Sequence, residues 1–215
     1  MPNVKIALTK MRCISETNEY SDSDEPYVLV FAAQIRNIGG LVNIPAAVTV
    51  MYGPWEDVDN GDLISTSVSI PGPIGKILNH PSENFWGLDG KPHELNNLDD
   101  VIFLTALMEN DDAQAGGIRA GLHAQLFASI SSYANAGMSR SSMVSHLIKD
   151  MRDILKGITV TGIPSSDDLL GVSEVRFDND ALQKVTKQTQ VKNIEIKGPS
   201  DQGGHYRLRF EMNKA

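Results

Sequence analysis

The sequence predicts a mainly β protein: an antiparallel β-sandwich with an inserted α-helical hairpin. Two observations lead to this fold class. Apolar runs of strand length lie on both sides of a central segment, and within that segment apolar residues recur at three- and four-residue steps. The length of 215 residues suits one domain over residues 1–215, with residues 113–157 as a helical hairpin inserted within it.

The predicted strands before the insertion differ in character. Residues 27–35 and 101–108 are continuous apolar runs, which are typical of strands buried on both faces. Residues 63–70 alternate apolar and hydroxyl side chains, as a strand with one solvated face does. Residues 4–11 and 43–52 complete the set as shorter β-type runs.

Residues 71–100 are rich in Pro, Gly, Asn and Asp and predict a long irregular connection. We expect a covering loop in which Phe85 and Trp86 plug the sandwich. A loop with a function of its own is the alternative, because long loops in compact domains are often functional.

The central segment predicts two helices joined by a turn at Asn135–Gly137. Ser139 is a suitable N-cap for the second helix, and Gly157 ends it. The apolar positions of the two stripes are Ile118, Leu122, Leu126, Ile130 and Tyr133, then Met143, Val144, Leu147, Ile148, Met151, Ile154 and Leu155. Such stripes need a partner, and the outer face of a sheet is the simplest one. Because the first helix is rich in Gly, Ala and Ser, detachment into a membrane interface is the alternative.

The last part of the chain returns to β structure. Residues 171–177 and 191–197 are short strand candidates, and residues 201–204 predict a turn. Residues 205–212 alternate apolar with charged side chains, which predicts a half-buried strand.

Composition excludes several functional classes. With 19 basic and 27 acidic residues the net charge is −8, which argues against binding to nucleic-acid phosphates. No apolar run is long enough to span a bilayer, and residues 1–10 lack the apolar stretch of a secretory signal. We therefore expect a cytoplasmic protein, or one secreted without a signal peptide. A single cysteine permits neither an intrachain disulfide nor a Cys-rich zinc site.

Aspartates cluster at the predicted strand ends, where they could bind Ca²⁺. The candidate metal ligands are Asp24, Asp111, Asp112 and Asp168, and with less support Asp22, Asp57, Asp59, Asp62 and Asp167. Ca²⁺ prefers carboxylate and carbonyl oxygens on flexible loops, and the loops at one end of a sandwich can converge. Residues 57–62 have the Asp-x-Asp-x-Gly spacing of a calcium turn but lack the closing Glu of an EF-hand. The alternative is that these aspartates are ordinary solvated turn residues.

Three of these strings carry a family resemblance. Ser-Asp-Glu-Pro-Tyr-Val at 23–28 resembles the Ser-Asp-Pro-Tyr-Val string of calcium-and-lipid-binding β-sandwich domains of the synaptotagmin kind, often called C-two domains. Asp-Asp-Leu-Leu-Gly at 167–171 is similar to the Asp-Asp-Phe-Ile-Gly string that closes the third calcium loop of that family, and Asp111 and Asp112 resemble its acidic start. The resemblance implies Asp24, Asp111, Asp112 and Asp168 as ligands of Ca²⁺.

The sequence departs from that family in two places. Glu25 is inserted into the first string, and the predicted helical hairpin separates the two acidic halves of the third loop.

Signatures of an enzyme are sparse. Cys13 lies inside the first strand pattern, where a cysteine is usually a small buried hydrophobe, and we expect it to be inert. The histidines lack the spacing of a zinc site, and His146 and Asp150 at i and i+4 are expected to be an ordinary helix pair. No serine lies in a nucleophile elbow.

The sequence is compatible with three functions. The first is a non-enzymatic Ca²⁺-binding β-sandwich module that contacts a phospholipid surface or a partner protein through its acidic loops. The second is a structural or toxin-like assembly protein that uses the helical hairpin without a metal. The third is a metal-dependent hydrolase built on loop 71–100 and the acidic clusters.

Overall fold

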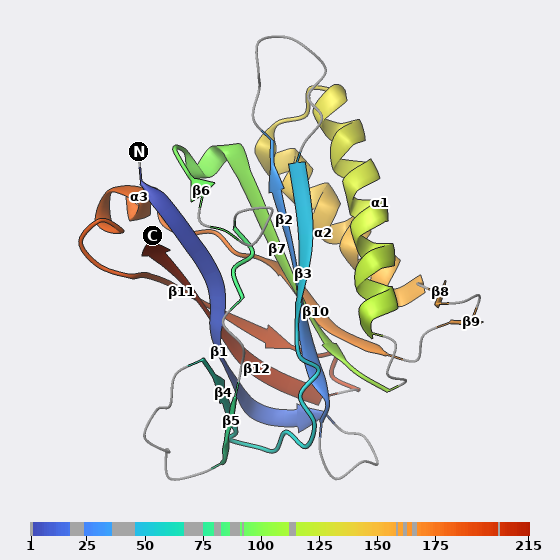
Figure 1. The fold of residues 1–215 in the computed structure, drawn as a ribbon. Coiled ribbons are helices and arrows are strands. Elements are labelled where there is room, and N and C mark those ends of the chain that lie inside the picture. Colours follow the sequence, from blue (N-terminus) through green and yellow to red (C-terminus); the bar gives the residue numbers. More distant parts are fainter. Residues whose placement is uncertain are drawn as a thin grey trace.

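The predicted fold class is confirmed: two mostly antiparallel sheets pack face to face, and a helical hairpin is inserted between two strands (Figure 1). The computed structural model describes residues 2–17, 24–35, 46–66, 75–79, 83–86, 91, 93–111, 115–157, 159–160, 163–164, 167–201 and 203–215.

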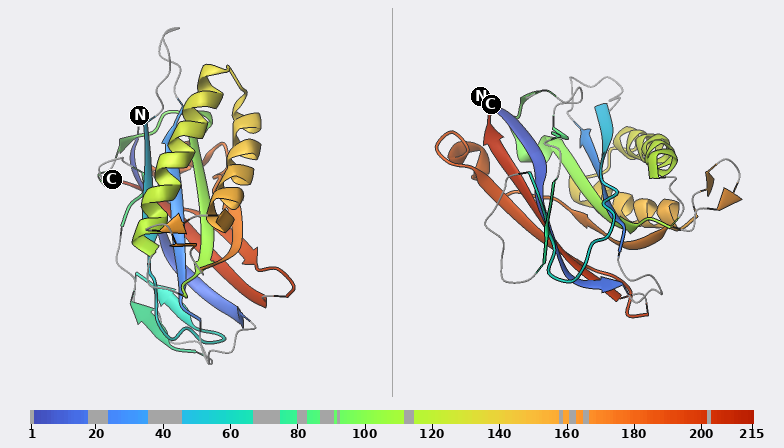
Figure 2. Two further views of the ribbon diagram at one scale, coloured as in Figure 1. Left: turned by 90° about the vertical axis from the view of Figure 1, so that its right-hand side faces the viewer. Right: turned by 60° about the horizontal axis from the view of Figure 1, so that its bottom comes forward.

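The larger sheet holds both ends of the chain. Its strands, in spatial order, are β11 (Gln190–Lys197), β12 (Gly203–Lys214), β1 (Asn3–Thr17), β4 (Leu63–Ser65) and β5 (Ile77–Asn79), with β6 (His93–Glu94) paired to the start of β1. β4 and β5 are parallel, whereas the other pairs are antiparallel. The two termini lie side by side in Figure 2, and the amide of Ala215 donates to the carbonyl of Asn3.

The smaller sheet is the middle layer of the molecule. Its strands are β10 (Asp168–Glu174), β7 (Val101–Glu109), β2 (Pro26–Gln34) and β3 (Ala46–Tyr52), in that spatial order. In β2, Val28 and Val30 pack into the core between the sheets, whereas Leu29 and Phe31 pack against the helices. Burial on both faces explains why β2 is a continuous apolar run rather than an alternating one.

The helical hairpin covers the outer face of this middle sheet, as predicted (Figure 2). It consists of α1 (Ala115–Asn135) and α2 (Arg140–Gly157). The apolar stripe of α1 is buried, with Ile118 and Leu122 fully enclosed. Ser139 caps α2 as expected, because its hydroxyl accepts a hydrogen bond from the amide of Ser142 at 3.3 Å. Among the described residues, no helix is both long and apolar enough to cross a membrane.

The described part of loop 71–100 plugs the sandwich as predicted. Phe85 and Trp86 are buried in the core between the sheets, and both rings meet the ring of Phe103 edge-on. The loop also contains β5, β6 and the 3₁₀ helix η1 (Leu98–Asp100), which the sequence pattern did not predict.

The strand that the sequence predicts at residues 171–177 begins and ends three residues earlier in the structure. β10 begins at Asp168 rather than at residue 171, because Asp168 and Leu169 pair with the end of β7. It ends at Glu174, although the amide of Val175 still donates to Phe103. Three small elements were also missed: β8 (Thr159–Val160), β9 (Ile163–Pro164) and α3 (Ala181–Lys184). They are too short to show a periodicity.

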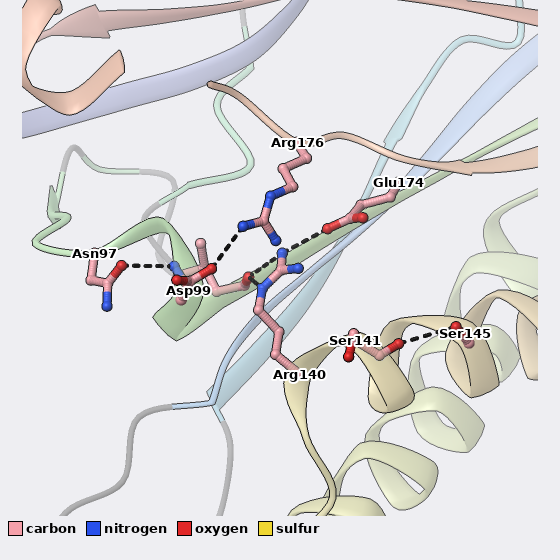
Figure 3. A network of polar contacts seen from close by, with 8 residues as sticks. Asn97, Asp99, Arg140, Ser141, Ser145, Glu174 and Arg176 are labelled. Carbon is pink, nitrogen blue, oxygen red and sulfur yellow. Dashed lines mark hydrogen bonds and ion pairs between the residues drawn. The ribbon is translucent and has the colours of Figure 1, made fainter. Parts of the chain in front are cut away.

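A polar network fastens α2 to the upper end of the middle sheet (Figure 3). The guanidinium of Arg140 donates to the carbonyl of Val101 at 2.9 and 3.0 Å and to the carboxylate of Glu174 at 2.7 Å. Beside it, Arg176 bonds Asp99 of η1 at 2.8 Å. The first turn of α2 is thereby held against the start of β7 and the end of β10.

Candidate functional site

The ends of β2, β7 and β10 that carry acidic residues lie at the lower end of the middle sheet as drawn in Figure 1. Glu109, the last residue of β7, is in register with Pro26 at the start of β2 and with Asp168 at the start of β10. Three segments that are far apart in the sequence therefore meet here. We call this group the acidic edge, and it comprises Glu25, Glu109, Asn110, Asp111, Asp167 and Asp168.

Glu25 and Glu109 join β2 to β7 at the acidic edge. The amide of Glu25 donates to the Glu109 carboxylate at 2.8 Å, and the Asn110 amide donates to the Glu25 carbonyl at 3.1 Å. The side-chain NH₂ of Asn110 donates to the Glu25 carboxylate at 3.3 Å. The Oδ1 of Asn110 is buried and accepts no hydrogen bond from the described residues. An orphaned acceptor next to carboxylates is a suitable ligand for a cation.

Asp167 joins β7 to β10 at the acidic edge. Its buried carboxylate accepts hydrogen bonds from the Tyr27 hydroxyl at 2.7 Å and from the Asp111 amide at 3.1 Å. Asp111 is exposed, and Asp168 is half-buried. Asp167 thus fixes the turn that leaves β7, while the carboxylates of Asp111 and Asp168 lie closer to solvent.

Asp24 points away from the acidic edge and into the sandwich. It is 2% exposed, and its carboxylate accepts hydrogen bonds from the Thr17 amide and hydroxyl and from the Tyr206 hydroxyl. The backbone of Asp24 also pairs with Val58. This buried carboxylate therefore ties β1 and β12 of the larger sheet to the loop that precedes β2.

Cys13 lies beside this network and is buried in β1, as expected from the sequence. Burial raises the pKa of the Cys13 thiol to about 12, although its hydrogen bond with Tyr206 partly opposes the rise. A thiol of this kind is a poor nucleophile at neutral pH.

The aspartates of residues 57–62 surround a lysine of the same chain. The Lys76 ammonium lies 2.5, 3.6 and 3.8 Å from the carboxylates of Asp57, Asp59 and Asp62, and Asp62 is 1% exposed. The hydrogen bond that the Lys76 ammonium donates to the Asp57 carboxylate raises the pKa of Lys76, which keeps the ammonium charged. Gly75 permits this approach, because a Cβ there would lie 2.3 Å from the carbonyl oxygen of Gly61.

The predicted ligands therefore divide into three groups. Asp111, Asp167 and Asp168 lie together on the acidic edge, whereas Asp24 and the residues around Lys76 have partners elsewhere. Asp22 and Asp112 lie outside the described residues. Among the residues that are described, no three Asp, Glu, His or Cys side chains are placed to hold a metal ion together.

Sequence analysis missed three members of the acidic edge: Glu25, Glu109 and Asn110. Their signal was present, because each lies within two residues of one end of a predicted apolar strand. Only aspartates were considered as candidate ligands, although Glu and Asn also supply oxygen ligands to Ca²⁺.

A hydroxyl and an imidazole meet at another place that the sequence did not indicate. The Thr49 hydroxyl of β3 lies 3.1 Å from Nδ1 of His123 on α1, in a shallow pocket of about 330 Å³ that Arg119 also lines. Among the described residues, no carboxylate hydrogen-bonds to His123 to complete a catalytic triad. We interpret the contact as a link between α1 and the sheet.

Comparison with known proteins assigns no family to this chain. No protein-family model, no curated protein sequence and no solved structure matches it.

Proposed function

We propose that this protein is a non-enzymatic β-sandwich module that binds Ca²⁺ at the acidic edge and contacts a phospholipid surface or a partner protein through the bound ion. The observation that carries the proposal is the convergence of acidic residues from three strand ends, with β7 in the centre. Like charges gathered in this way repel one another, and a divalent cation removes the repulsion.

The residues of the acidic edge suit a hard cation. Ca²⁺ takes about six to eight oxygen ligands. Asp111 and Asp168 offer carboxylates near the surface, and the Oδ1 of Asn110 is an amide oxygen that needs a partner. Asp112, which follows Asp111 in the sequence, is a further candidate. Since the described carboxylates do not form a complete site as they stand, binding would have to draw these oxygens together.

The helical hairpin is one of the two departures from the C-two pattern, and its position in the fold is compatible with a single calcium loop. The hairpin separates Asp111 from Asp168 in the sequence, but the two strands that flank it, β7 and β10, are paired neighbours. The chain therefore leaves the sheet at the end of β7 and re-enters it at the adjacent start of β10. This arrangement supports a single interrupted calcium loop in which Asp111 and Asp168 act together.

Net charge explains why the ion would matter for function. At −8 the protein is repelled by anionic lipid, and an ion bound at the acidic edge would reverse the local charge and bridge to a phosphate or carboxylate. Asp24 does not take part in this proposal, because its carboxylate is enclosed between the sheets.

Calcium titration after chelation tests the proposal. At a Ca²⁺ concentration about one hundred times the dissociation constant, the free energy of unfolding should rise by about 2.7 kcal/mol, which is a melting shift of several degrees. Asp168→Asn should remove most of this shift. Asp201→Asn is the matched control, since Asp201 is exposed and lies in the turn before β12. An unmoved melting temperature at millimolar Ca²⁺ would refute the proposal.

Co-sedimentation with phosphatidylserine vesicles then separates the two kinds of partner. Ca²⁺-dependent sedimentation that Asp168→Asn abolishes supports a phospholipid surface. A melting shift without sedimentation supports a protein partner.

A further inference from the structure

Two edge strands of the sandwich lie beside each other, and only one of them is covered. β10 ends the middle sheet, and β11 ends the larger sheet. Between them runs a groove of about 490 Å³, lined by Leu169–Ser173 of β10, residues 195–199 of β11 and its following turn, and Arg152 and Lys156 of α2. At its floor Gly171 approaches Ile196 so closely that a Cβ on Gly171 would lie 2.8 Å from the Ile196 side chain.

The edge of β10 is closed by α2. The amide of Val175 donates to Phe103, and hydrogen-bonded pairs alternate in an antiparallel ladder. The backbone groups of Val172 therefore point away from β7. Arg152 of α2 donates to the Val172 carbonyl at 3.4 Å, which occupies this outward-facing acceptor. Covering an edge with a helix is a common protection against unwanted strand pairing.

The edge of β11 is open. The amide of Gly198 donates to Gly204, so the even-numbered residues of β11 bond to β12 by the same alternation. The backbone groups of Val191, Asn193, Glu195 and Lys197 consequently face away from β12. Among the described residues, none of these backbone groups has a hydrogen-bond partner, and the four side chains are exposed. Such an edge can accept a further strand.

The charge beside this edge is positive, in contrast to the whole protein. Arg152, Lys156 and Lys197 line the groove, and within the described structure none of them forms an ion pair with a carboxylate. Glu195 is the acidic residue of the groove lining. Arg207 bonds it at 2.6 Å, which lowers the pKa of Glu195 and offsets its charge.

We propose that the open edge of β11 binds an extended acidic peptide of a partner protein by strand addition. Backbone hydrogen bonds to the odd-numbered residues would hold the peptide, and alternate acidic side chains would meet Arg152, Lys156 and Lys197. The charge complementarity favours this occupant over a second copy of the chain, whose own β11 carries lysines. The proposal does not depend on Ca²⁺ binding at the acidic edge.

Titration with two synthetic peptides in the presence of a chelator tests the charge preference. One is a ten-residue peptide in which glutamate alternates with valine, and the other has lysine in place of glutamate. We expect binding of the glutamate peptide only, and a loss of at least tenfold in affinity for Lys156→Glu combined with Lys197→Glu. Lys187→Glu is the control, because Lys187 is exposed and lies outside the groove. Equal binding of both peptides, or of neither, would overturn the proposal.

Amide hydrogen exchange tests the strand geometry separately. With the glutamate peptide bound, the amides of Val191, Asn193, Glu195 and Lys197 should gain protection, whereas those of Lys192 and Ile194 are already bonded and should change little. Asn193→Pro removes an outward-facing donor without touching the bonds to β12, so it should weaken binding while the melting temperature is retained. Protection that appears only in α2, or binding of anionic vesicles in place of the peptide, would contradict strand addition.

Discussion

At the scale of single residues, the buried trio of Cys13, Asp24 and Tyr206 has the clearest chemical consequence. The Tyr206 hydroxyl donates to the Asp24 carboxylate, and the Cys13 thiol lies against the same hydroxyl. Burial raises the pKa of both Cys13 and Tyr206, so the folded state keeps both groups neutral. The network stabilises the fold only while they retain their protons.

Alkaline titration should reveal this coupling. The pKa of Cys13 is about 12 in the fold and about 9 in an ordinary thiol, so the unfolded chain releases its proton first as the pH rises. The stabilisation is complete below pH 9 and is lost progressively towards pH 12. Between pH 8 and 11 the free energy of unfolding should fall by about 2 kcal/mol more in the wild type than in Cys13→Ser. Urea denaturation at both pH values measures the difference, and equal losses would contradict the burial argument.

At the scale of elements, α2 is held by one arginine as well as by its apolar stripe. Arg140 reaches both the start of β7 and the end of β10, so it fixes where the hairpin sits on the sheet (Figure 3). Its side chain is 15% exposed. Charged hydrogen bonds that are partly buried contribute more to the free energy of unfolding than those on the surface.

Removal of this arginine should be costly. Arg140→Ala leaves Glu174 without its ion pair and should lower the free energy of unfolding by about 2 kcal/mol. Arg140→Lys should recover only part of the loss, because lysine cannot reproduce the forked contact with Val101 and Glu174. Lys149→Ala is the control, since the Lys149–Asp153 pair on the same helix is exposed. Guanidinium denaturation measures all three, and indistinguishable midpoints would show that Arg140 contributes nothing.

At the scale of the whole molecule, the middle sheet belongs to two cores at once. One core fills the space between the sheets and contains both tryptophans, and the other lies between the middle sheet and the helices. Because β2 and β7 contribute side chains to both, we expect the two cores to unfold together as one cooperative unit.

A single substitution under the helices tests this cooperativity. Leu122 is fully buried between α1 and the sheet, so Leu122→Ala should cost about 2–5 kcal/mol. Helix content by circular dichroism reports the outer core, and the fluorescence of Trp55 and Trp86 reports the core between the sheets. Both melting curves should shift by the same amount. If the helix signal were lost first while the fluorescence stayed unchanged, the hairpin would be a separate unit.

The sequence alone was sufficient for the long helices and strands, although not for the short elements such as β8 and α3. Four-residue periodicity places α1 and α2 almost to the residue, and the continuous apolar runs identify β2 and β7, because burial on both faces leaves no polar position. It also placed Cys13 in a buried strand and the acidic residues at strand ends.

Only the tertiary structure decided which partner each acidic side chain contacts. Neighbouring side chains on an extended chain point to opposite sides, so Asp24 is enclosed against Tyr206 while Glu25 joins the acidic edge. Lys76 meets Asp57 because β5, the next strand along the chain, pairs in parallel with β4. The open edge of β11 likewise follows from sheet order, which depends on long-range pairing and leaves no periodic trace in the sequence.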